Sequence, residues 1–277
     1  MSPRAGESPL TSILAIDPAW TADQPSGIAL LNEVAHGWQC LALAPSYEQF
    51  MALADGLPVD WSTQPTASLP VAAELLGAAQ RMLDGSAVDL VTIDMPVSMS
   101  PISSRRAADN AISQMFGGRG CGAHSPSVTR PGSISDVLCT DFRDMGYPLA
   151  TSTASPGMTP ALIEVYPHPA LLVLMDAPYR LQYKVSKTGR YWPKLPPSER
   201  RRKLVEMWFD ICQILGETFA CAELPMPTAY EAEQFRTAEL KRYEDALDAL
   251  ICGWIGVRYL EGHCTAFGDE TAAIWTP

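Results

Sequence analysis

Three apolar segments of the chain end in the same way, with an isoleucine, an acidic residue and then a proline. They read Ile16-Asp17-Pro18, Ile93-Asp94-Met95-Pro96 and Ile163-Glu164-Val165-Tyr166-Pro167. Proline has no N–H for a sheet ladder, so each proline predicts that a buried strand ends nearby. A single aspartate at a strand end is usually a turn residue. Three repeats of the pattern favour a shared site, because parallel neighbours bring their carboxyl ends to one edge of a sheet.

A second acidic feature lies in the helix that we expect over residues 237–260. Asp245 and Asp248 are three residues apart and therefore share a helix face. Nine uncharged residues follow Asp248. A buried carboxylate needs a basic side chain, a helix N-terminus or a metal ion as its partner. The alternative is that this face is simply exposed to solvent.

Together these acids suggest a metal site. Carboxylate oxygens are the ligands that Mg²⁺ and Mn²⁺ prefer. We therefore expect Asp17, Asp94, Asp245 and Asp248 to converge as metal ligands and catalytic residues, with Glu164 as a further ligand. Two such ions about 4 Å apart can activate a water and stabilise the leaving oxygen of a phosphodiester.

The order of the elements predicts an α/β fold. Buried strands are expected at 12–16, 27–31, 38–43, 88–93 and 161–165, and helices at 69–83, 105–116, 134–143, 169–175, 198–219 and 237–260. The first three strands read as an antiparallel meander, and the later ones alternate with helices, which indicates a mixed five-stranded sheet flanked by helices. We expect one domain over 1–277, with helical and loop insertions at about 97–160 and 176–236.

Composition narrows the cellular setting. No apolar run approaches the ~20 residues of a membrane span, and the first eleven residues lack the order of a signal peptide. Seven cysteines occur without a C-x-x-C pair, so we expect reduced thiols and a cytoplasmic protein. Cys121 and His124 form a C-x-x-H, but the sequence shows no second half of a zinc site.

Basic residues are concentrated in one stretch of an otherwise acidic chain. The net charge is −11, yet residues 180–203 hold nine of the 20 basic residues and only one acid, Glu199. This contrast favours a nucleic-acid partner, DNA or RNA, bound through the stretch, although such a stretch can also be only a solvated surface. The candidate substrate-binding residues are Arg119, Lys184, Lys187, Tyr191, Trp192, Arg200, Arg201 and Arg202. Arg119 lies in the glycine-rich segment 117–122, which we expect to be a flexible loop and a possible lid.

Five segments spread along the chain carry a family resemblance: LAIDPAW (14–20), VTIDMP (91–96), IEVYPHP (163–169), YEDALDALICG (243–253) and GDETAAIWTP (268–277). Their order resembles the RNase H-like superfamily and, more narrowly, the family called domain of unknown function 429, described as predicted RNase H-like nucleases. The resemblance implies that Asp17 is the first-strand acid and Asp94 the fourth-strand acid. Asp245 and Asp248 resemble the D-x-x-D of the last helix in Holliday-junction resolvases of this fold. Glu164 has no usual counterpart there.

Three functions remain open at this point. The first is a metal-dependent nuclease that hydrolyses phosphodiester bonds through a two-metal carboxylate site. The second is a non-catalytic nucleic-acid or nucleotide-binding module on the same fold. The third, a phosphotransferase of the actin-like fold, needs a glycine-rich phosphate loop after the first strand. Only one glycine occurs between Asp17 and position 27, so we rank it last. His168 could assist a proton transfer or be structural.

Overall fold

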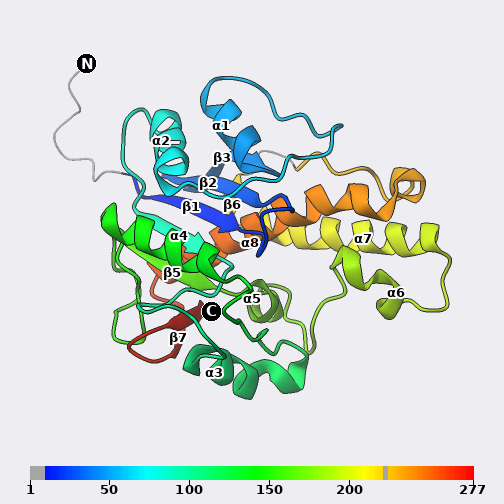
Figure 1. The fold of residues 1–277 in the computed structure, drawn as a ribbon. Helices are drawn as coiled ribbons and strands as arrows, with labels where there is room; N and C mark the ends of the chain where they lie inside the picture. Colours follow the sequence, from blue (N-terminus) through cyan, green and yellow to red (C-terminus); the bar gives the residue numbers. More distant parts are fainter. Residues whose placement is uncertain (1–9, 221–223) are drawn as a thin grey trace.

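A computed structural model describes residues 10–220 and 224–277. Within these ranges the chain forms an eight-stranded mixed sheet in the order β6-β3-β2-β1-β4-β5-β8-β7 (Figure 1). The strands are β1 (Ser12–Asp17), β2 (Gly27–Val34), β3 (Gly37–Ala44), β4 (Leu90–Ile93), β5 (Ala161–Val165), β6 (Phe219–Ala220), β7 (Thr265–Gly268) and β8 (Ala273–Thr276). Strands β1, β4, β5 and β8 run parallel to their neighbours in that series, whereas β2 is antiparallel to both β1 and β3.

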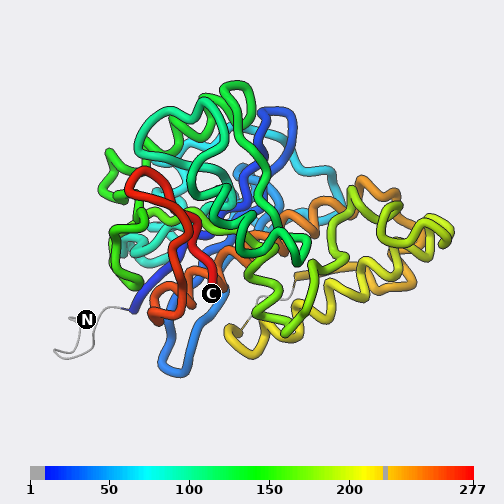
Figure 2. The backbone as a smooth tube through the Cα atoms, turned by 90° about the horizontal axis from the view of Figure 1, so that it is seen from below, coloured from blue at the N-terminus to red at the C-terminus, as the bar shows by residue number. Residues whose placement is uncertain are grey.

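Helices cover the sheet and carry its connections. They are α1 (Tyr47–Ala54), α2 (Ala72–Met82), α3 (Ala107–Phe116), α4 (Ser133–Asp144), α5 (Pro167–Leu174), α6 (Thr188–Tyr191), α7 (Pro197–Leu215) and α8 (Lys241–Leu260). Short 3-10 helices lie at η1 (Gly117–Arg119), η2 (Val185–Lys187), η3 (Glu231–Gln234) and η4 (Thr237–Leu240). Helix α6 and the outer part of α7 project away from the sheet in both ribbon and tube views (Figures 1 and 2).

The central strand β1 separates two apolar cores. Alternate side chains of a strand point to opposite faces. Ile13 and Ala15 belong to the core formed with α5, α7 and α8. Leu14 and Ile16 belong to the core formed with α1, α2 and α4. Both faces of β1 are therefore buried, which explains why the sequence of this strand is continuously apolar instead of alternating.

Most of the expected elements are present. The α/β class is confirmed, and each of the five predicted strands has a counterpart in the sheet. Strands β6, β7 and β8 extend the sheet to eight, and α1 was not predicted. The helix expected over 198–219 ends at Leu215, because the chain turns there and residues 219–220 enter the sheet. The segment 117–122 is not entirely a loop, since its first three residues form η1.

Two further sequence expectations can be compared with the described residues. No helix in 10–220 or 224–277 is both long enough and apolar enough to cross a membrane. No disulfide joins Cys121, Cys139, Cys252 or Cys264 within that part of the chain. Cys221 and the segment 1–9, which entered the arguments on thiols and signal peptides, lie outside the described residues.

Candidate active site

The carboxyl ends of β1 and β4 bring two aspartates side by side. Ile16 pairs with Ile93 in the parallel ladder, so Asp17 and Asp94 occupy equivalent positions at the ends of neighbouring strands. The ladder continues by one further bond, in which the N–H of Asp94 donates to the carbonyl oxygen of Ile16 at 3.0 Å. Both side chains are partly exposed at this edge.

The other two aspartates, on helix α8, lie at the same edge of the sheet. Gly27 pairs with Asp17 across the antiparallel ladder. A Cβ built on Gly27 would lie 1.8 Å from the carbonyl oxygen of Asp245, so only glycine allows the helix backbone to approach this strand. Asp245 therefore lies beside the end of β1, and Asp248 follows one turn along the same buried helix.

Two lysines that sequence reasoning did not assign to this cluster are its ionic partners. Lys184 forms an ion pair with Asp248 and lies 3.6 Å from the carboxylate of Glu244. Lys241 forms ion pairs with Asp245 and, at 2.9 Å, with Glu244. The segment before η2 was expected to bind substrate. In the structure it folds onto α8, and the N–H of Val185 donates to Glu244.

Tyr183 completes this contact between the basic segment and α8. Its hydroxyl donates to Oδ1 of Asp248 at 2.8 Å, and the indole N–H of Trp208 donates to its main-chain carbonyl oxygen at 2.8 Å. Neither Glu244 nor Tyr183 stood out in the sequence. The only available signal was that Glu244 precedes Asp245 and Asp248 on the same helix.

Burial and the negative charges of neighbouring carboxylates raise the pKa values of the four aspartates. Burial, followed by repulsion from Asp248, raises the pKa of Asp17 well above its usual value, while Lys184 opposes the shift. Burial also raises the pKa of Asp94 to about 8 and that of Asp245 to about 7, with Lys184 opposing in the first case and Lys241 in the second. The pKa of Asp248 is raised for the same reason. Each of these four acids is thus less acidic because it is buried among like charges.

Several carboxylate oxygens of this cluster have no partner among the described residues, and carboxylate oxygens are suitable ligands for a divalent cation. In the part of the chain that is described, the carboxylates of Asp17 and Asp94 have no hydrogen bond or ion pair, and Oδ2 of Asp245 is buried without a partner. Hard oxygen donors of this kind suit Mg²⁺ or Mn²⁺. Over the same residues, however, no three acidic, histidine or cysteine side chains are arranged as a ready-made ligand shell. Lys184 and Lys241 supply the positive charge in this conformation.

Glu164 is engaged elsewhere. Both terminal nitrogens of Arg106 donate to its carboxylate, at 2.5 and 2.7 Å, and the N–H of Val97 donates to it at 3.0 Å. Arg106 is also paired with Asp109 at 2.7 Å. Burial raises the pKa of Glu164, and Arg106 opposes the shift. Both oxygens of Glu164 therefore accept hydrogen bonds that fix the segment after β4, and the charge of Glu164 also contributes to the raised pKa of Asp94.

Most of the other nominated substrate-binding residues are committed to the protein itself. Arg119 donates to the carbonyl oxygens of residues 177 and 178, Arg200 to those of 193 and 195, and Arg201 to those of 232 and 233. Arg202 forms an ion pair with Glu233 at 3.2 Å. Tyr191 and Trp192 are partly buried and pack edge to face, with ring centroids 5.6 Å apart. Lys187 is exposed.

His168 lies at the start of α5, behind the cluster. Its Nε2 is 2.5 Å from a terminal nitrogen of Arg180, and its Nδ1 is buried without a partner among the described residues. Burial, reinforced by Lys184 and Arg180, lowers the pKa of His168 well below its usual value. Arg180 therefore donates to a neutral imidazole, which leaves the proton on Nδ1. Cys121 is buried and contacts the carbonyl oxygen of His168.

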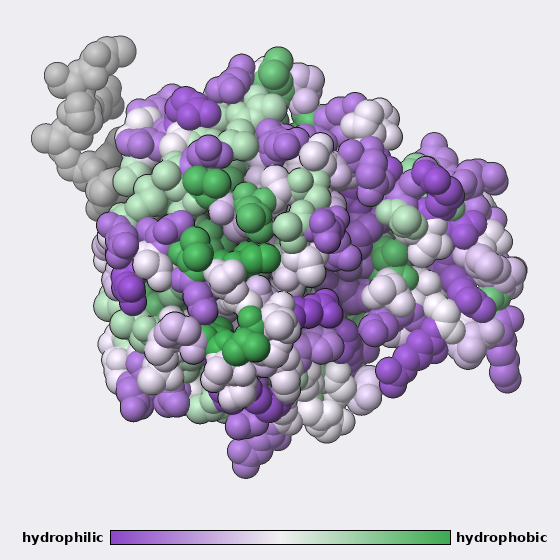
Figure 3. Space-filling view, in the orientation of Figure 1, coloured by the Kyte–Doolittle hydropathy of each residue, from purple (hydrophilic) through white to green (hydrophobic). Residues whose placement is uncertain are grey.

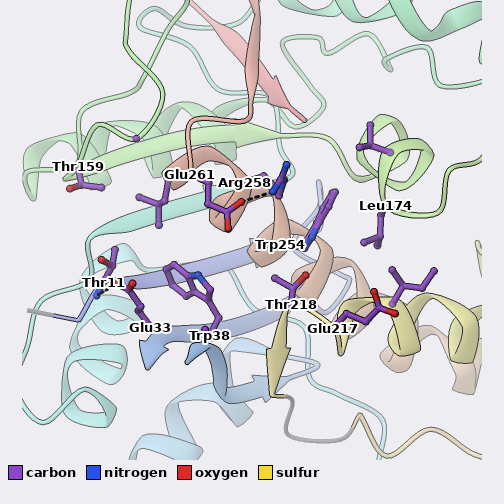
Figure 4. A pocket seen from close by; sticks show the side chains of 15 residues that line it. Thr11, Glu33, Trp38, Thr159, Leu174, Glu217, Thr218, Trp254, Arg258 and Glu261 are labelled. Atoms are coloured by element: carbon purple, nitrogen blue, oxygen red, sulfur yellow. Dashed lines mark hydrogen bonds and ion pairs between the residues drawn. The ribbon is translucent and has the colours of Figure 1, made fainter. Parts of the chain in front are cut away.

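A separate cavity of about 900 Å³ lies at the opposite edge of the sheet. Figure 4 shows Thr11, at the entrance to β1, and Trp38 on one side of it, with Trp254 and Arg258 of α8 on the other. Arg258 and Glu261, which both line the cavity, form an ion pair at 2.5 Å. None of the four aspartates lines this cavity, so its volume says nothing about the carboxylate cluster.

Comparison with known proteins gives one match, to a family of unknown function. Residues 138–273, a segment that contains β5, α7 and α8, match the family described as "Protein of unknown function (DUF429)". The resemblance proposed from the sequence motifs is confirmed to this extent. The chain has no match among curated proteins or among solved structures.

Proposed function

We propose that this protein is a metal-dependent nuclease of RNase H-like architecture that hydrolyses phosphodiester bonds at the carboxylate cluster. The central strands β3-β2-β1-β4-β5, with β2 antiparallel to its neighbours, support that architecture. They are the five strands that the sequence resemblance implies, with α8 packed across β1 and β2. The remaining strands then count as additions to this core, and residues 97–160 and 176–236 as its insertions.

One observation carries the proposal. Asp17 and Asp94 end adjacent parallel strands, and α8 brings Asp245 and Asp248 close enough that their charges raise the pKa of Asp17. A fold gains no stability from gathering four acids at one edge, two of them buried and two partly exposed, because desolvation and repulsion both oppose it. Such a cluster is typical of a functional site.

The residues divide into two roles. Asp17, Asp94, Asp245 and Asp248 would hold Mg²⁺ or Mn²⁺, which in such sites activates water and neutralises the charge on the leaving oxygen. Lys184 and Tyr183 hold Asp248 in position, and Lys241 holds Asp245. Glu164 acts indirectly, since its pair with Arg106 fixes the chain just after Asp94.

The two lysines also favour a second candidate, a nucleic-acid or nucleotide-binding module without catalysis. Lys184 and Lys241 already neutralise part of the acidic charge, as a structural cluster would require. This alternative predicts that divalent ions have no effect on folding stability or on ligand binding.

The experiment that separates these candidates uses the whole chain. Mn²⁺ binding is measured by titration calorimetry, and cleavage of labelled single-stranded and duplex DNA and RNA is measured in Mn²⁺ and in EDTA. We expect Mn²⁺ binding and Mn²⁺-dependent cleavage, both lost in Asp94→Asn. Lys203→Gln, an exposed change on α7, is the control. Absence of Mn²⁺ binding in the wild-type protein would refute the nuclease proposal.

A further inference from the structure

Three connections that leave the carboxyl ends of strands meet beside the carboxylate cluster. Trp20 follows β1, His124 and Arg130 lie in the connection after β4 and α3, and Arg180 and Lys187 follow β5 and α5. The second and third connections touch directly, because the N–H of Arg180 donates to the carbonyl oxygen of Arg119 at 2.9 Å. Loops at this edge of an α/β sheet are where ligands are usually bound.

The first two connections meet through their side chains. The ring of His124 packs edge to face on Trp20, with centroids 6.4 Å apart. The guanidinium of Arg130 lies 5.7 Å from the centroid of the same indole. His124 and Arg130 are exposed and Trp20 is partly so. An aromatic ring and a planar cation are thus presented together at the surface.

The third connection joins this group to the acids. Arg180 contacts His168, whose ring packs on Tyr183 with centroids 5.4 Å apart, and Tyr183 donates to Asp248. Burial lowers the pKa of His124, and the positive charges of Arg180, Lys187 and Arg130 lower it further. These cations therefore lie within electrostatic reach of one imidazole. A hydrophilic recess between the sheet-based body and the projecting α6–α7 part is visible in Figure 3.

Unlike the arginines of α7, two of these cations are not tied to the main chain. Arg130 and Lys187 are exposed, and within the described residues neither side chain has a hydrogen bond or a salt bridge, Arg130 having only its contact with Trp20. The chain has a net charge of −11, and these unpaired cations lie next to four acids. Arg130 and Lys187 would therefore favour the binding of an anionic ligand. Phosphates bind to such cations, and unpaired bases stack on exposed aromatic rings.

We propose that Trp20, His124, Arg130, Arg180 and Lys187 form a binding surface for a single-stranded polynucleotide, which leads its backbone to the carboxylate cluster. The inference rests on the proposed function for the chemistry at the cluster, but it makes its own claim about binding. Arg130 and Lys187 contact phosphates, and a base contacts the Trp20–Arg130 pair. A duplex keeps its bases stacked within the helix and cannot use Trp20 in this way.

The test measures binding in EDTA, so that neither metal nor cleavage contributes. Anisotropy of a short fluorescein-labelled oligothymidylate is followed with wild-type protein and with Arg130→Glu/Lys187→Glu. We expect the double variant to bind at least about tenfold more weakly and its log–log salt slope to fall by about 1.4, corresponding to two phosphate contacts on a single strand. Trp20→Phe should bind several-fold more weakly, because a smaller ring stacks less well.

Arg81→Glu/Arg143→Glu is the matched control, since it changes the charge equally. Arg81 is in the last turn of α2 and Arg143 in that of α4, which lead toward the starts of β4 and β5. We expect this control to retain wild-type affinity. Equal losses in both double variants, unchanged affinity in Arg130→Glu/Lys187→Glu with a wild-type melting temperature, or equal binding of duplex would each overturn the proposal. Displacement of the oligonucleotide by equimolar thymidine monophosphate would also overturn it, in favour of a mononucleotide site. These binding measurements contain no metal, so they test the polynucleotide surface even if the nuclease proposal is refuted.

Discussion

The main chain of Gly27 lies directly against the main chain of Asp245, so close that a Cβ on Gly27 would be 1.8 Å from the Asp245 carbonyl oxygen. Gly27 is the ladder partner of Asp17. This single contact therefore fixes how near the acids of α8 come to the acid of β1. The geometry of the candidate site depends on a residue that has no side chain.

Replacing Gly27 by alanine should damage both the packing and the site. The added methyl meets backbone rather than a movable side chain, so α8 must shift, at a cost of about 1–3 kcal/mol or more. Urea denaturation measures the loss. Gly77→Ala is the control, because nothing lies closer than 3.9 Å to its Cβ, and alanine in a helix is expected to stabilise by up to about 1 kcal/mol. Equal effects of the two substitutions would contradict the close approach.

Asp94→Asn should stabilise the metal-free protein, increasingly so at higher pH. Burial raises the pKa of Asp94 to about 8, whereas an unfolded aspartate titrates near pH ~3.9. Because its pKa is higher in the folded than in the unfolded state, Asp94 contributes fully to folding stability below pH ~3.9. This stability is lost as the pH rises toward 8. Melting temperatures in EDTA should therefore diverge between variant and wild type from pH 5 to pH 8. A constant difference across this range would show that Asp94 is not strained by its neighbours.

Lys184→Gln should destabilise the metal-free protein by about 3 kcal/mol or more, because it leaves the buried Asp248 without its ionic partner. Millimolar Mn²⁺ should reduce this deficit, since a cation bound only to the folded state raises stability. The comparison is of melting temperatures with Mn²⁺ and with EDTA, with exposed Lys203→Gln as the reference. If the deficit is identical in both conditions, the lysine and the metal do not serve the same carboxylates.

Glu164→Gln tests whether the third strand-end acid belongs to the metal site. The variant weakens the charged contact with Arg106, so we expect a loss of about 1–3 kcal/mol in unfolding free energy. Its Mn²⁺ affinity, measured by calorimetry, should stay at the wild-type value, in contrast to Asp94→Asn. A loss of Mn²⁺ affinity without a loss of stability would return Glu164 to the ligand set.

Arg201→Ala tests the assignment of the α7 arginines to structure rather than to substrate. The guanidinium donates to two carbonyl oxygens around η3, and removing it should cost about 1–3 kcal/mol. Oligonucleotide affinity in EDTA should be unchanged. Lys203→Ala, an exposed change on the same helix, should alter stability by no more than about 0.5 kcal/mol. If Arg201→Ala binds the oligonucleotide more weakly but is as stable as the wild type, the α7 arginines contact substrate after all.

The sequence by itself indicated five of the eight described strands, β1 to β5, and the acidic residues at the ends of β1, β4 and β5. Apolar segments such as 12–16 and 161–165 that stop near a proline favour buried strands, and the apolar spacing of residues 237–260 favours a helix. In the structure α8 begins at Lys241, after the 3-10 helix η4. These patterns are local properties, since each follows from a few neighbouring residues. For the same reason, the acids Asp17, Asp94, Asp245 and Asp248 can be identified from the sequence alone.

The tertiary structure decided which charges meet. Lys184 was expected to bind substrate, and in the structure it pairs with Asp248, 64 residues further along the chain. Arg106 neutralises Glu164, 58 residues away, and Arg201 is engaged with main-chain carbonyls around η3. Local patterns carry no information about such pairs, because a charged side chain looks the same in sequence whether its partner is water, phosphate or a distant carboxylate. The packing of α8 against β1 and β2, permitted by Gly27, brings Asp248 to the position where Lys184 pairs with it. Contacts between other distant segments give Arg106 and Arg201 their partners.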